Sequence, residues 1–112
     1  MHAPAASLSI DVVELTGHLT CEALDAALAG VEPRPPMVLV VDCRAMTGYD
    51  AEARRRFVEW HREHRDRIAA VAVVTEKRLW HMIVSAMSLA SGQRMRAFDA
   101  MDQARAWAAA GG

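Results

Sequence analysis

The stretch "MVLVV" at residues 37–41 decides the fold of this 112-residue chain. It is a continuous apolar run, and the segment directly before it, "VEPRPP" at residues 31–36, is rich in proline and excludes a helix. An apolar run of this length without alternation predicts a central strand that is buried on both faces of a sheet.

The segments before this strand predict one strand and one helix. "LSIDVVEL" at residues 8–15 is rich in β-branched residues and partly alternating, which is typical of a strand covered mainly on one side. Thr20 is placed to cap a helix over residues 21–29. We expect Gly30 to end this helix in the left-handed conformation.

After the central strand, Asp50 is placed to cap a helix that runs to about Arg67. "AVAVV" at residues 70–74 predicts a second buried strand. The apolar side of the helix consists of residues at helical spacing: Ala53, Phe57, Trp60, His64 and Ile68.

The last third of the chain predicts a helix, a strand and a final helix. Thr75 is expected to cap a helix over residues 76–91, and Gly92 is expected to close it. "RMRAF" at residues 94–98 predicts a strand, and Asp99 is expected to start the final helix.

The predicted order β-α-β-α-β-α-β-α places the chain in the α/β class. Strands separated by helices mostly run parallel, with right-handed crossovers. We therefore expect one domain over residues 1–112, with helices packed on a single-layer, mostly parallel sheet of four to five strands. The sequence leaves open whether an extra edge strand precedes residue 8, because "MHAPAAS" is short and poorly patterned.

Composition excludes several functions. The formal net charge is −1, so no global positive field exists to hold DNA or RNA. The N-terminus lacks the basic start and apolar run of a signal peptide, and no apolar stretch approaches the roughly 20 residues of a membrane span. Cytoplasmic location is therefore expected. Cys21 and Cys43 form no CxxC pair and are expected to be ordinary thiols.

Three segments carry a family resemblance that extends over roughly residues 10–108. They are "VVDCRAMTGYDAEARRRF", "AVVTEKRLW" and "SGQRMRAFDAMDQARAW". Together they resemble the SpoIIAA-like family, also described as STAS/SEC14-like proteins. The resemblance implies a small α/β domain related to bacterial anti-sigma-factor antagonists and, more loosely, to lipid-binding SEC14 folds.

Anti-sigma-factor antagonists of this type are switched by phosphorylation of a serine in a pattern like Asp-Ser-Ser-Gly. Asp50 matches the aspartate, but Ala51, Glu52 and Ala53 follow it, so no phosphoacceptor serine is present. Glu52 places a negative charge at a helix N-terminus, where the helix dipole favours it. That charge either serves the helix alone or holds the domain in a state like the phosphorylated one.

Residues 42–50 are expected to form a regulatory loop with Asp42, Asp50 and Glu52. Asp42 stands where a catalytic acid can sit, but a carboxylate there also ties the free N–H groups of a loop. Since no nucleophile or phosphate-binding glycine loop accompanies it, we expect a structural role and no enzymatic activity.

"HREH" places His61 and His64 one helical turn apart, close enough to share a metal ion. Zinc sites usually need three or four protein ligands, and no further ligand has a recognisable spacing. We therefore expect no metal or other cofactor, and a partly buried imidazole at His64.

The stretch "LWHMIVSAMSLASG" at residues 79–92 has more apolar surface than one helix face requires. At about 100° per residue, the predicted core face consists of Leu79, Met82, Ile83, Ala86, Leu89 and Ala90. A second ridge consists of Trp80, Val84 and Met87. The apolar arc spans about 220°, roughly twice what a surface helix needs.

Three kinds of partner can cover the second ridge. They are neighbouring elements of the same domain, for example the C-terminal helix around Trp107, a second copy of the chain, and a ligand or membrane. Basic residues near the helix ends suit anionic headgroups, although the segment is long enough only to lie on a bilayer. These residues are Lys77, Arg78, Arg94 and Arg96.

The sequence thus favours a non-catalytic cytoplasmic regulatory or protein-interaction domain that acts through an apolar helix surface, as a homodimer or with another protein. The alternative is a carrier or sensor of a lipid or another small hydrophobic molecule. Its pocket would lie beneath the 76–91 helix and be lined by Trp80, Met82 and Met87.

Overall fold

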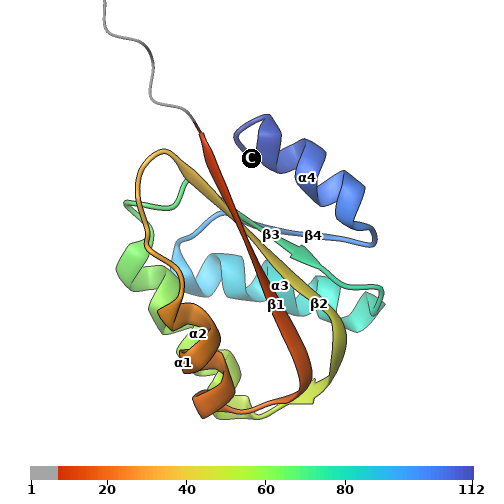
Figure 1. The fold of residues 1–112 in the computed structure, drawn as a ribbon. Coiled ribbons are helices and arrows are strands. Elements are labelled where there is room, and N and C mark those ends of the chain that lie inside the picture. The colour runs from red at the N-terminus through yellow and green to blue at the C-terminus, as the bar shows by residue number, and fades with distance from the viewer. Residues whose placement is uncertain (1–7) are drawn as a thin grey trace, which may run out of the picture.

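The computed structural model of the protein describes residues 8–112 and has an α/β fold (Figure 1). Strands and helices alternate along this part of the chain, as the sequence predicts. The elements are β1 (Ser9–Leu19), α1 (Cys21–Ala29), β2 (Met37–Tyr49), α2 (Ala51–His64), β3 (Ala70–Val74), α3 (Arg78–Ser91), β4 (Met95–Phe98) and α4 (Met101–Ala109).

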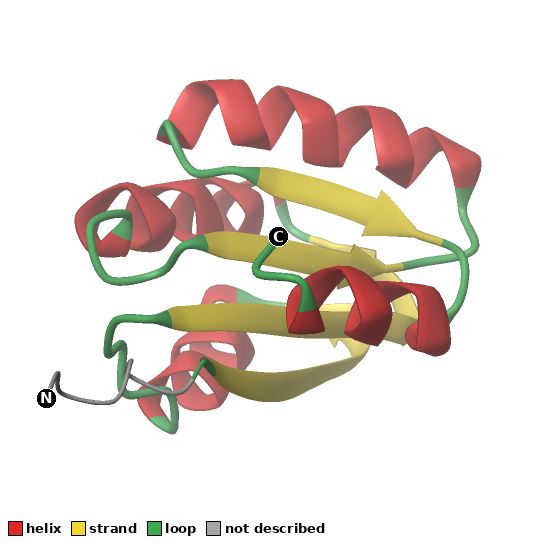
Figure 2. Ribbon diagram, turned by 90° about the horizontal axis from the view of Figure 1, so that it is seen from above, coloured by secondary structure: helices red, strands yellow, loops and turns green. Residues whose placement is uncertain are grey.

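The four described strands form one parallel sheet in the order β1-β2-β3-β4. Each helix between two strands leads to the next parallel strand, and α1, α2 and α3 all pack on one face of the sheet. The fourth helix, α4, packs on the other face. In Figure 2, α4 lies on the near side of the strands. The sequence left open whether an extra edge strand precedes residue 8. Residues 1–7 lie outside the described residues.

The central strand is buried on both faces, and this prediction is confirmed. Met37, Leu39 and Val41 face the layer of three helices. Val38 and Val40 face α4. All five side chains are completely buried. The alternation of a strand therefore divides one apolar run between two cores.

The strand β2 continues past Val41 to Tyr49, so the expectation of a loop over residues 42–50 is wrong. β3 ends opposite Asp42, but β2 goes on pairing with β1 as far as Leu19. The register shifts twice in this region because β2 contains an extra residue at each shift. Such bulges bend a strand and hide its alternation, which explains why this polar stretch looked like a loop. We call residues 15–19 and 43–49 the β1–β2 arm.

Thr20 and Asp50 both occupy N-cap positions, but only Thr20 caps its helix through its side chain. The N–H of Ala23 donates to Thr20 Oγ1 at 3.2 Å, as expected. The carboxylate of Asp50 instead contacts Nε2 of His18 at 2.7 Å. It therefore links the start of α2 to β1. The prediction that the Asp50 side chain caps α2 is wrong.

The start of α3, the start of α4 and the end of α2 also differ from expectation. Thr75 Oγ1 accepts a hydrogen bond from the N–H of Lys77 at 3.2 Å, and α3 begins at Arg78. Asp99 contacts His81 at 3.1 Å, and α4 begins at Met101. Thr75 thus satisfies the turn after β3, whereas Asp99 links the end of β4 to α3, and both helices begin later than expected. The second helix, α2, ends at His64 instead of about Arg67.

Gly92 and Gly30 follow α3 and α1, and their backbones differ. Gly92 has a φ of 72°, so the predicted left-handed ending of α3 is confirmed. Gly30 has a φ of −82° and is right-handed, so the same prediction for α1 is wrong. Only the first position requires a residue without a side chain.

The Gly92→Ala variant is expected to lower the free energy of unfolding by about 1–2 kcal/mol, because an L-residue resists positive φ. The matched variant Gly30→Ala should leave it unchanged or raise it by up to about 1 kcal/mol. Urea denaturation of the two variants and the wild type measures both values. Equal effects at the two positions would contradict this assignment.

Candidate functional site

The helix α3 is rotated relative to expectation, so the second ridge faces the main core and most of the predicted core face points outward. Val84 is only 2% exposed, and Trp80 and Met87 are half-buried against the main core. Three large side chains of the predicted core face point outward: Leu79, Met82 and Leu89 are 65%, 70% and 87% exposed. Ile83, from the same predicted face, is half-buried and lines the pocket on the inner side. The sequence was right that α3 has two apolar sides and wrong about which side meets the sheet.

Trp80 is covered by the β1–β2 arm of its own chain. Its ring meets the Tyr49 ring edge to face, with the centroids 5.5 Å apart. Lys77 Nζ lies 4.1 Å from the centroid of the indole and donates a hydrogen bond to the carbonyl oxygen of Met46 at 3.1 Å. These contacts tie the arm to the first turn of α3.

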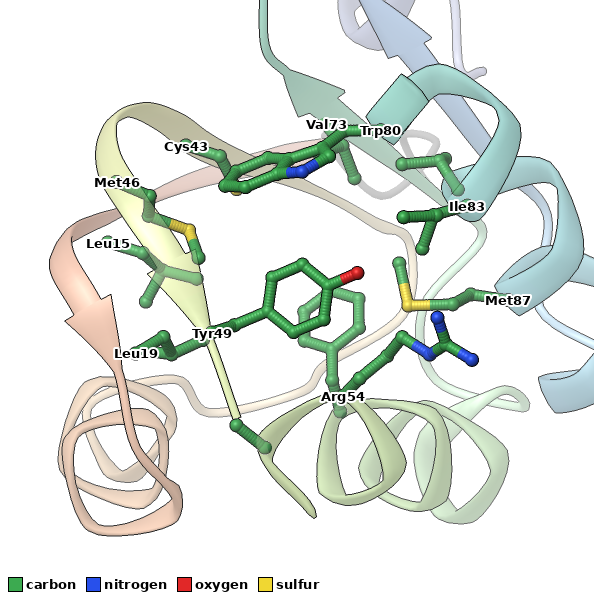
Figure 3. Close-up of a pocket in the computed structure, with 13 residues that line it drawn as sticks. Leu15, Leu19, Cys43, Met46, Tyr49, Arg54, Val73, Trp80, Ile83 and Met87 are labelled. Atoms are coloured by element: carbon green, nitrogen blue, oxygen red, sulfur yellow. The ribbon is translucent and has the colours of Figure 1, made fainter. Parts of the chain in front are cut away.

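A pocket lies where the arm, α2 and α3 meet, and its cavity has a volume of about 60 Å³ (Figure 3). Trp80 and Met87 line it, as the alternative prediction requires, but Met82 lies on the opposite side of α3. The lining consists of Leu15, Leu19, Cys43, Met46, Tyr49, Ala53, Arg54, Phe57, Val73, Trp80, Ile83, Val84 and Met87.

Sequence reasoning missed the two polar side chains of this pocket, Tyr49 and Arg54. Tyr49 lies in the stretch taken for a loop, and Arg54 opens a run of three arginines that otherwise reads as a solvated helix face. Had residues 43–49 been recognised as a bulged strand, Tyr49 would have been placed beside α3. No local signal separates Arg54 from its neighbours.

The opposite side of α3 presents an apolar stripe to the surroundings. Leu79, Met82, Ala86 and Leu89 are exposed and follow one another at intervals of three, four and three residues. We call these four residues the outer face of α3. The helix contains no acidic residue, and Arg78 is its only arginine or lysine.

The acidic residues predicted to form a regulatory loop have different surroundings. Asp42 is buried within β2 and accepts hydrogen bonds from Arg44: one from its backbone N–H at 3.1 Å and two from its guanidinium at 2.9 Å each. These bonds lower the pKa of Asp42, while burial opposes them. Asp50 contacts His18, and Glu52 is exposed in the first turn of α2. Asp42 thus accepts a hydrogen bond from the backbone N–H of Arg44, and its structural role stays a prediction.

Cys43 lines the pocket as a protonated thiol. Burial, and secondarily the charge of Asp42, raises its pKa to about 12. Since the thiolate is the nucleophilic form, this side chain is chemically quiet at neutral pH. Both cysteines are free, in agreement with the sequence.

His61 is the fully buried histidine of α2, and His64 is partly buried as predicted. The ring of His61 packs against Phe57 and Trp60, with centroids 4.4 and 4.9 Å away, and neither of its nitrogens has a hydrogen-bond partner. Burial, and secondarily the charge of His64, lowers its pKa to about 3. His64 is half-buried and places Nδ1 2.7 Å from the carbonyl oxygen of Trp60.

Residues 8–112 contain neither a metal-binding cluster nor a membrane-spanning helix. No group of three or more His, Cys, Asp or Glu side chains in this part of the chain is arranged to hold a metal ion. None of its helices combines the length and apolar character that a membrane crossing requires.

The chain belongs to the SpoIIAA-like family, whose sequence model matches residues 10–109. A similar solved structure is an uncharacterized protein of the DUF3478 family with a SpoIIAA-like fold from Shewanella loihica PV-4. The two chains are 19% identical, and the match covers 86% of this chain and 81% of the other with a TM-score of 0.65. At this identity the likeness concerns the fold. None of the curated proteins compared with the chain matches it.

The His61→Leu variant is expected to remove part of the acid sensitivity of the fold. The unfolded chain binds a proton at His61 below about pH 6.5, whereas the folded chain does so only near pH 3, so stability falls as the pH drops between these values. From pH 7 to pH 5 this one group costs about 2 kcal/mol of unfolding free energy. Urea denaturation at both pH values should show that loss in the wild type and a smaller loss in the variant.

A matched control is His64→Gln, which removes the half-buried imidazole of the same helix. It should keep the acid-dependent loss that His61 causes. An equal pH dependence in His61→Leu and wild type would show that the buried imidazole is not the source.

Proposed function

We propose that the protein is a non-catalytic cytoplasmic interaction domain that forms a homodimer through the outer face of α3. The observation that carries this proposal is the exposure of three large apolar side chains along one helix. Leu79, Met82 and Leu89 are each at least 65% exposed and lie in one line. Contiguous apolar surface of this kind is typical of a protein interface.

The spacing of the outer face supports a second helix as the occupant. Intervals of three, four and three residues are those of the apolar seam in a coiled coil, where side chains of one helix fill gaps in the other. An antiparallel pair with its two-fold axis between Ser85 and Ala86 would set Met82 of one chain against Leu89 of the other. The small side chain of Ala86 would then lie at the crossing point, which allows a close approach.

The charges of α3 suit an antiparallel pair of identical helices. Arg78 stands at the start of the helix, and the partner's helix would end beside it. The carbonyl groups at a helix C-terminus carry partial negative charge, so the guanidinium would be stabilised there. No acidic side chain of either helix would have to be desolvated in the seam. The two copies of α3 thus complement each other electrostatically as well as in shape.

The state of the chemically reactive groups supports a role in binding rather than catalysis. The carboxylate of Asp42 is committed to Arg44, and the thiol of Cys43 is held protonated by burial. At the start of α2, residues 51–53 offer no hydroxyl for phosphorylation. The exposed Glu52 gives this helix end a permanent negative charge, so a partner there would meet a constant surface instead of a switched one.

The Met82→Glu variant is expected to weaken the dimer at least about a hundredfold, because the two-fold axis would bury two new carboxylates in an apolar seam. Size-exclusion chromatography with light scattering over a range of protein concentrations measures the molar mass. The wild type should approach twice the mass of one chain, and the variant should remain at the mass of one chain.

A matched control is Ala106→Glu, which adds the same charge to the exposed side of α4. It should dimerise like the wild type. A wild type that stays monomeric at tens of micromolar, or equal masses for the wild type and Met82→Glu, would contradict the proposal. Circular dichroism of each variant verifies that the fold is retained.

A further inference from the structure

We propose that the pocket beneath the β1–β2 arm is a binding site for a short amphiphilic carboxylate, an acid with a small hydrocarbon tail. The site lies on the inner side of α3 and is therefore distinct from the outer face of that helix. The inference does not depend on dimer formation. It rests on the lining of the pocket and on the partners of its polar groups.

The lining selects a hydrocarbon tail. Apart from Tyr49 and Arg54, every side chain that lines the cavity is aliphatic, aromatic or sulfur-containing. The volume of about 60 Å³ accommodates only a few carbon atoms in the present side-chain arrangement. Met46 and Met87 are unbranched, so changes of their rotamers can enlarge the space. Short acids therefore fit better than long-chain lipids.

The charge at the pocket selects an anionic head. Arg54 is the only charged residue of the lining, and it forms no ion pair within residues 8–112. The nearby Lys77 is already held by the carbonyl oxygen of Met46 and the ring of Trp80. One unpaired guanidinium matches a monoanion, and its planar geometry suits the two oxygens of a carboxylate.

The second polar group, the hydroxyl of Tyr49, is placed to donate a hydrogen bond to the same carboxylate. Among the described residues this hydroxyl has no hydrogen-bond partner. Figure 3 shows the hydroxyl and the Arg54 guanidinium both directed toward the side of the pocket where Met87 lies. The carboxylate of Asp42 does not repel an incoming anion, because its charge is already neutralised by Arg44. A carboxylate at this side would gain two donors while its tail enters the apolar cavity.

Methionine methyl NMR with hexanoate as the probe tests the site on the full chain. The resonances of Met46 and Met87, which line the pocket, should shift in a saturable manner. The resonance of Met82 should stay unchanged, because Met82 lies on the outer face of the same helix. Absence of shifts at Met46 and Met87, or shifts centred on Met82, would overturn the proposal.

Two arginine variants test the role of the charge. Arg54→Leu should weaken hexanoate binding about tenfold, since it removes a charge-assisted pair. Arg55→Leu removes the same charge from the next residue, which is exposed like Arg54 but lies outside the pocket, and should bind like the wild type. Hexan-1-ol, which has the same tail without the charge, should bind about tenfold more weakly than hexanoate. Equal affinities for the two arginine variants, or for the alcohol and the acid, would overturn the proposal.

Discussion

The pairing of β2 with β1 continues beyond the end of β3 and shapes the inner side of α3 and the pocket. Up to Asp42 the two strands belong to an ordinary parallel sheet. Beyond it, two extra residues in β2 bend the pair into the β1–β2 arm. The arm carries Tyr49 to the indole of Trp80 and the carbonyl oxygen of Met46 to Lys77. Without this bend, the inner side of α3 would lack the cover that forms the pocket.

The arm also accounts for the unusual breadth of the apolar surface on α3. A helix that covers one face of a sheet needs a single apolar stripe. Here the inner side meets both the sheet and the arm, and this explains Trp80, Val84 and Met87. The apolar side chains of the outer face do not pack against the rest of the described chain, because Met82 and Leu89 are mostly exposed. The excess apolar surface inferred from the sequence is therefore real, but it lies on the side opposite to the one expected.

Burial governs the chemistry of the polar groups within this core. It raises the pKa of Cys43 and lowers that of His61, and in each case the neutral form is favoured. Asp42 differs because Arg44 supplies both hydrogen bonds and an opposite charge, so its pKa is lowered. The same interior that keeps these groups unreactive leaves Arg54 unpaired at the margin of the pocket. This arrangement supports the binding role that we propose.

The amino-acid sequence alone predicted the order of the elements, the two-sided burial of residues 37–41 and the family of the chain. These features follow from local pattern, because apolar runs, proline and Gly92 act within a few residues. It did not reveal the arm, since residues 43–49 become a strand only by pairing with β1. It did not fix which side of α3 faces inward either. Helical spacing sets the angles between side chains, whereas the rotation of the helix about its axis is decided by the space that the sheet and the arm leave for Trp80.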